Sequence, residues 1–270
     1  VRRKPNQNNK EAINMNKEAN IAKRETAGAL ATNFEADANQ GAQNIKQEDL
    51  ALPFLKVLGN ASPEINPKDA KYVQGAQPGM ILNSVTNDIY PAANGAKGIN
   101  VLPVFYERQY IEWQDRDKSK GGPVRIYKAG DDIPQTKRDA GFKDRLPNGN
   151  YLENTVNHYV IVMGNTPSSA LISMKATQLK VSRKWNSMMM GIKLQGKNGL
   201  FTPPTYSHIY NLKTVRMSND KGQWFGWDVT KVGPVKDNAV YAIAKQFAGR
   251  VSKGEIVAKH KTDESKDLPF

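Results

Sequence analysis

The chain has 270 residues, with 39 lysine and arginine side chains against 26 aspartates and glutamates, so its formal net charge at pH 7 is +13. This charge favours a polyanionic partner, which is either nucleic acid or an anionic membrane surface. Cysteine is absent, which excludes disulfides, thiolate zinc sites and cysteine nucleophiles and is compatible with a reducing cytoplasm. No stretch approaches 18 continuous apolar residues, so no membrane span is expected; of the two polyanionic partners we expect nucleic acid and no membrane.

Three segments differ in composition. Residues 1–47 are rich in Asn and Gln and poor in large apolar side chains, which predicts a polar arm, either helical or disordered. Residues 48–253 contain the apolar periodicity of a folded domain. Residues 254–270 are polar again and predict a flexible C-terminal tail.

Within the folded domain, β-branched and aromatic runs predict strands, and 3.6-residue apolar periodicity predicts two helices. The strands are expected at residues 80–85, 89–90, 99–113, 124–127, 158–164, 170–174, 206–217 and 222–231, and the helices at 178–190 and 237–252. The charge-rich stretch 114–157 lacks strong periodicity and predicts an irregular insertion, either a functional loop or a mobile segment.

This order of elements predicts a mainly β fold with flanking helices, of the α+β class. A five-stranded Greek-key barrel of the OB type carries its helix between the third and fourth strands, which fits the helix at 178–190 followed by two strands. The strands upstream exceed five, so insertions into an OB-like barrel are expected, together with a C-terminal helix and flexible arms at both ends.

The segment 175–227 combines positive charge with aromatic rings. Between Lys175 and Lys221 it has nine basic residues against a single acid, Asp220. Cations attract a phosphate backbone and flat rings stack on unpaired bases, so the combination favours binding of single-stranded nucleic acid. Trp185 lies on the apolar stripe of the helix at 178–190 and is expected to pack in the core.

The candidate contacts to nucleic acid are cations and rings on this segment and on the strand at 99–113. The cations are Arg108, Lys180, Arg183, Lys184, Lys193, Lys213 and Arg216. The rings from which stacking residues are expected are Tyr106, Tyr110, Tyr206, Tyr210, Trp224 and Trp227. Period-two alternation places Tyr106, Arg108 and Tyr110 on one face of their strand. Trp224 and Trp227 point to opposite faces unless Gly226 forms a bulge, so one of the two is expected to be exposed.

No pattern argues for catalysis, and we expect no enzyme, no cofactor and no metal site. The run 191–197 (GIKLQGK) matches most of a P-loop, but Asn198 replaces the Ser or Thr that would hold magnesium, and a helix precedes it where a strand should stand. The three histidines lie far apart, which disfavours zinc. Asp115, Asp117, Asp131 and Asp132 are read as surface charges and not as a nuclease metal site.

The last four residues, Asp267, Leu268, Pro269 and Phe270, resemble the C-terminal tip of bacterial and phage single-stranded-DNA-binding proteins. The body, with its barrel-like pattern and basic aromatic segment, is similar to the phage-type members. The resemblance implies that the tip docks into basic-rimmed pockets on replication and repair enzymes. The tail here departs from the family in being only weakly acidic, because Lys259, Lys261 and Lys266 offset its acids.

We therefore expect a non-enzymatic protein of a bacterial virus that coats single-stranded DNA and recruits replication or recombination enzymes through its tip. Its location would be the cytoplasm, that of the host cell if the protein is viral, and a homo-oligomer is compatible with this role. The main alternative is a virion structural or assembly protein whose basic surface lies against packaged DNA. A duplex-DNA regulator is a further alternative, although no helix-turn-helix signature is present.

Overall fold

The computed structural model describes residues 33–46, 49–115, 117–118, 121–220, 222–258 and 260. The chain divides into two compact units, residues 1–50 and residues 51–270. In the first unit, residues 33–36 form one turn of helix, and the described residues of 33–46 are exposed. The expected arm over 1–47 otherwise lies outside the described residues.

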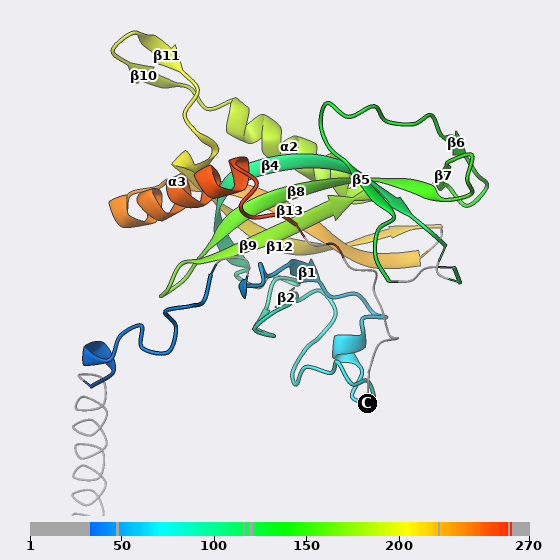
Figure 1. Ribbon diagram of the computed structural model, residues 1–270, viewed down its shortest axis with the longest axis horizontal. Coiled ribbons are helices and arrows are strands. Elements are labelled where there is room, and N and C mark those ends of the chain that lie inside the picture. Colours follow the sequence, from blue (N-terminus) through cyan, green and yellow to red (C-terminus); the bar gives the residue numbers. More distant parts are fainter. Residues whose placement is uncertain are drawn as a thin grey trace, which may run out of the picture. The chain divides into compact units, whose positions relative to one another are not determined.

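The second unit is built on one large antiparallel sheet (Figure 1). Its strands are β4 (Ile99–Trp113), β5 (Arg125–Tyr127), β6 (Lys137–Arg138), β7 (Asp144–Arg145), β8 (Tyr151–Met163), β9 (Ser168–Lys175), β12 (His208–Asn219) and β13 (Gly222–Pro234). The five long strands lie in the order β13-β12-β4-β8-β9. The sheet curls into a half-barrel, and within the described residues its edge strands β9 and β13 do not pair with each other.

Smaller elements complete the unit. They are the strands β1 (Leu55–Val57), β2 (Ile81–Asn83) and β3 (Ile89–Tyr90), the hairpin β10 (Leu194–Gly196) and β11 (Gly199–Phe201), the helices α2 (Leu179–Met190) and α3 (Asn238–Ser252), and the 3-10 turns η2 (Pro63–Ile65), η3 (Ala176–Gln178) and η4 (Thr205–Ser207). The mainly β class with flanking helices is confirmed. Figure 1 shows the β10–β11 hairpin extending away from the sheet beyond the end of α2.

Local sequence signals explain several boundaries. Strand β4 begins and ends at the predicted residues. Helix α3 begins after Asp237, whose carboxylate accepts hydrogen bonds from Ala239 N at 2.8 Å and Val240 N at 3.3 Å, as expected for an N-cap. Strand β8 begins at Tyr151, within the stretch expected to be irregular, because it pairs with β4 as far as Trp113.

Each face of the sheet carries its own apolar core. Helix α2 packs Trp185 and Met189 against one face, which we call the α2 face. Helix α3 packs Val240 and Phe247 against the other. The two helices lie on opposite sides, so the central strands β4 and β8 are buried on both faces where the helices cover them.

A row of rings crosses the α2 face and joins the sheet to the helix. The His158 ring stacks on Trp185 with 4.4 Å between centroids and meets the Tyr106 ring edge-on at 5.2 Å. His158 Nε2 lies 2.8 Å from the Ser182 hydroxyl. Complete burial lowers the pKa of His158 to about 3, so the imidazole is neutral at pH 7 and behaves as a packing ring.

The flexible tail was predicted to begin at residue 254, but buried residues occur beyond that position. Ile256 and Ala258 are buried against the α3 side of the sheet, and His260 Nε2 lies 3.0 Å from Gln109 Oε1 on β4. The apolar side chains at 256 and 258 are too few to form a recognisable pattern, which is why composition alone assigned them to the tail. Asp267 to Phe270 lie outside the described residues.

The insertion between β4 and β8 is folded and held by ion pairs. Asp115 accepts from Arg145 Nη1 at 2.7 Å and from Lys143, and Asp139 accepts from Arg145 Nε at 2.7 Å. The hydrogen bonds from Arg145 and then Lys143 lower the pKa of Asp115 to about 2. Local sequence did not reveal this order because the paired residues are 28 to 30 positions apart.

Glu112, near the end of β4, ties the same insertion to the sheet. Its buried carboxylate accepts from Asn148 Nδ2 at 2.9 Å, from Asn150 Nδ2 and from the Tyr127 hydroxyl at 3.2 Å. Burial by itself raises the pKa of Glu112, but these three hydrogen bonds outweigh it and the net pKa is lowered. The charged carboxylate is therefore the form that the fold stabilises.

Replacing Trp185 by Ala should lower the free energy of unfolding by about 3–5 kcal/mol, because the substitution empties a fully buried, stacked position. Denaturant titration followed by circular dichroism measures it. The matched control is Met190→Ala on the same helix, where the side chain is exposed and a change below about 1 kcal/mol is expected. Equal losses for both variants would contradict the packing described.

The Asp115 carboxyl should titrate near 2 in the folded protein, against an ordinary value of 3.8. Because the folded-state pKa is the lower one, the carboxylate stabilises the fold above about pH 4 and this contribution disappears as pH falls from 3.8 to about 2. Carboxyl 13C shifts followed by NMR provide the measurement. Arg145→Ala should move the midpoint back toward 3.8, and a midpoint that is already ordinary in the unsubstituted protein would refute the ion-pair assignment.

Candidate nucleic-acid interface

Three side chains on β4 form a strip on the α2 face. Tyr106, Arg108 and Tyr110 pair with His158, Val156 and Asn154 of β8 in one unbroken register, which confirms that the three share a face. Arg108 is exposed and both tyrosines are half-buried. We call these three residues the Arg108 strip.

The two tyrosines flank Arg108 on the same face of β4. Hydrogen bonding to Tyr106 raises the pKa of Arg108, against the opposing effect of partial burial, and Tyr110 acts in the same direction as Tyr106. The guanidinium is charged at any physiological pH. A guanidinium flanked by rings can donate to a phosphate while a base lies against a ring face.

Both tyrosine rings of the Arg108 strip pack against other side chains of the fold. Tyr106 contacts His158 and thereby Trp185, while Tyr110 packs against the small cluster that contains Tyr127 and Leu152. Beside Tyr110 the amide oxygen of Asn154 is buried and has no hydrogen-bond partner in the described part of the chain. A buried acceptor without a partner is costly, and here it adjoins an exposed cation.

Helix α2 presents three more cations. Lys180, Arg183 and Lys184 are exposed on the side away from the buried Trp185. Lys184 Nζ lies 3.5 Å from Asp228 Oδ1, a solvent-exposed pair of little strength. Within the described residues, no carboxylate lies at ion-pair distance from Lys180 or Arg183, so both remain available to an external anion.

The helix and the strip are linked through the sheet. One row of the α2 face runs from Arg108 through Val156 to Met174 near the end of β9, and the chain enters α2 four residues beyond Lys175. The basic helix therefore starts at the same end of the half-barrel as the strip. Arg108 and the cations of α2 are therefore neighbours in the fold, although they lie more than 70 positions apart in the sequence.

Two of the candidate rings are in the core. Tyr210 is 0% exposed and Trp227 is 5% exposed, and both contact the cluster around Trp185. Their prediction as stacking rings is wrong. Alternation correctly placed Tyr210 and Leu212 on one face of β12, but it does not indicate which face the core occupies.

The remaining candidates are scattered. Trp224 is half-exposed and lies opposite Met217, with no register shift at Gly226, so it points away from the face that buries Trp227, as the spacing predicted. Lys213 shares the face of Trp224, whereas Arg216 lies on the other face and bonds to Gln223. Tyr206 packs its ring 5.3 Å from Tyr241, and Lys193 bonds to Thr202 on the β10–β11 hairpin.

Comparison with models of protein families identifies the family of the chain. Residues 21–257 match the family model described as Pam3 phage gp34-like protein. The chain belongs to the Pam3 phage gp34-like family. Comparisons with curated proteins and with solved structures gave no match. The family's name supports the expectation of a phage protein.

In this member of the Pam3 phage gp34-like family, the described residues contain no group of three His, Cys, Asp or Glu side chains that could hold a metal ion. Asp115 is engaged by Arg145 and Lys143. Across that same part of the chain, no helix combines the length and apolarity needed to cross a bilayer. The segment resembling a P-loop, residues 191–197, runs from the end of α2 through β10 and is not a phosphate-binding strand–loop–helix.

Sequence reasoning missed Asn154 as a site residue. The signal that identifies it is its register opposite Tyr110, which requires that β8 be known to begin at Tyr151. A second signal was available in the sequence: no aspartate or glutamate occurs between Glu153 and Asp220, a stretch that contains β9, α2, the β10–β11 hairpin and all of β12.

Proposed function

We propose that this phage-type protein binds single-stranded DNA stoichiometrically, without catalysis, during replication or recombination in the host cytoplasm. The observation that carries the proposal is the Arg108 strip: an exposed arginine flanked on one face of the central strand by two half-buried tyrosines. Such a surface neutralises phosphate and offers stacking edges without reading sequence.

The strand order supports an OB-like architecture as part of this proposal. In chain order the five long strands are β4, β8, β9, β12 and β13, and α2 lies between the third and the fourth. Their spatial order, third-second-first-fourth-fifth, is that of an OB barrel opened between its third and fifth strands. The gap is partly filled by β1, beside which Leu171 N donates to Pro53 O at 2.8 Å.

Some of the candidate residues lie near the places where OB-like barrels bind oligonucleotides. These are the surface of the second and third strands and the loops after the first and fourth. Tyr110 lies near the end of the first long strand, where the first of those loops begins, and Arg216 and Trp224 flank the turn that corresponds to the second. Charge and rings therefore occur at both loops.

The alternative, a virion assembly protein, is favoured by one observation. The β10–β11 hairpin extends from the body and leaves Leu200 71% exposed and Phe201 48% exposed. Apolar side chains at the end of an extended hairpin suit a protein contact. Size-exclusion chromatography without DNA separates the two functions, because large ordered assemblies would favour the assembly role.

Arg108→Ala should weaken binding of an oligothymidine roughly tenfold, about 1.4 kcal/mol, and should reduce the steepness of the salt dependence by about 0.7. Fluorescence anisotropy at several salt concentrations, with duplex DNA as competitor, measures both. Arg108→Lys keeps the charge and should recover part of the affinity. Lys253→Ala, an exposed cation beyond α3, is the matched control. No binding by the unsubstituted protein, or equal binding of duplex DNA, would exclude the proposed function.

The partner-binding role of Asp267 to Phe270 is proposed on their resemblance to the tips of single-stranded-DNA-binding proteins. Because packing extends to His260, a chain ending at Lys261 is the suitable truncation. It should keep its affinity for oligothymidine within about twofold and lose binding to replication enzymes that dock such tips, measured by surface plasmon resonance. Retained enzyme binding would assign the contact to another part of the chain.

A further inference from the structure

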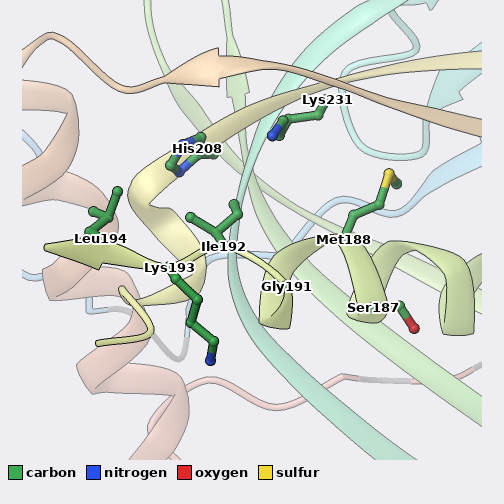
Figure 2. Close-up of a pocket in the computed structure, with 8 residues that line it drawn as sticks. All are labelled: Ser187, Met188, Gly191, Ile192, Lys193, Leu194, His208 and Lys231. Carbon is green, nitrogen blue, oxygen red and sulfur yellow. The ribbon is translucent and has the colours of Figure 1, made fainter. Parts of the chain in front are cut away.

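A groove lies at the other end of α2 from the Arg108 strip. It encloses about 500 Å3 and is lined by the last turn of α2, the start of the β10–β11 hairpin and the paired ends of β12 and β13. Figure 2 shows Met188 and Ile192 on one side of this space and His208 and Lys231 on the other, whereas Lys193 points away from it. Such a volume is in the range of small-ligand sites.

The lining residues suit a ligand that joins an apolar ring to an anionic group. Met188 and Ile192 supply an apolar wall, and Lys231 supplies an exposed cation at the opposite wall. None of the eight lining residues is acidic, and within the described residues no carboxylate lies at ion-pair distance from Lys231. The groove therefore favours an anionic ligand with a flat apolar part.

His208 adds an uncharged ring to the wall that carries Lys231. Its Nδ1 lies 2.9 Å from the Ser207 hydroxyl. Burial lowers the pKa of His208, and the charge of Lys231 lowers it further. At pH 7 the groove thus combines one localised cation with an uncharged imidazole.

A second hollow continues the groove. It encloses about 420 Å3, shares Leu194 and His208 with the first and adds the Tyr241 ring. The acidic residue of this lining, Asp237, caps α3, because its carboxylate accepts hydrogen bonds from Ala239 N and Val240 N. The two adjoining hollows together therefore have room for more than one nucleotide unit.

We propose that this groove binds a nucleotide of the same DNA strand that crosses the Arg108 strip, with the phosphate on Lys231 and the base against Met188 and Ile192. The inference rests on the proposed function. The twelve residues of α2 span about 18 Å between the two places. The exposed cations of α2 lie between them, so one strand can follow a single positive path.

The test compares Lys231→Glu with Lys253→Glu, which makes the same charge change on an exposed residue outside the groove. The probes are labelled oligothymidines of about sixteen and about four nucleotides, which bracket the site sizes of single OB-type modules. Lys231→Glu should weaken the long probe at least fivefold and reduce its salt slope by about 0.7, while Lys231→Arg should bind as the unsubstituted protein does. The short probe, held at the Arg108 strip, should bind within about twofold of the unsubstituted protein.

A second readout locates the contact directly. Photocross-linking of a long probe carrying 4-thiothymidine should label the peptide containing Met188 or that containing His208. If the unsubstituted protein binds both probes while Lys231→Glu matches Lys253→Glu and neither peptide is labelled, the groove proposal fails and the proposed function stands. If the unsubstituted protein binds neither probe, both fail.

Discussion

The candidate site depends on the contacts of His158, which stacks on Trp185 and meets the Tyr106 ring edge-on. His158 fixes α2 to the sheet and at the same time fixes the ring that borders Arg108. Because burial keeps His158 neutral at pH 7, this contact costs no buried charge. A cation next to a rigid ring can hold a strand with little loss of side-chain entropy on binding, which is the advantage of a preorganised surface.

The fold keeps many of the exposed cations apart from the acidic side chains. The acid-free stretch 154–219 supplies the helix and strands that carry the exposed cations, while acids such as Asp115 and Glu112 are engaged within the insertion between β4 and β8. The positive charge therefore stays available on the α2 side. On the opposite side, α3 with Ile256, Ala258 and His260 covers the sheet, and on the α2 side Arg108 is exposed on the central strand β4.

Much of this architecture could be predicted from local patterns. Strand β4, helix α3 with its Asp237 cap and the shared face of Tyr106, Arg108 and Tyr110 follow from period and capping chemistry. Tyr210 and Trp227 were misassigned because alternation separates faces without identifying the buried one. The packing of Ile256, Ala258 and His260 and the ion-paired insertion depend on contacts between distant residues, which no local pattern encodes.

The central claim is that the Arg108 strip touches DNA. Ultraviolet cross-linking of an oligothymidine to the full chain, followed by peptide mapping, tests it most directly. We predict labelling of Tyr106 or Tyr110 that disappears at high salt and is not competed by duplex DNA at equal concentration. Efficient cross-linking confined to residues outside β4 and α2, with both tyrosines unlabelled, would contradict the account.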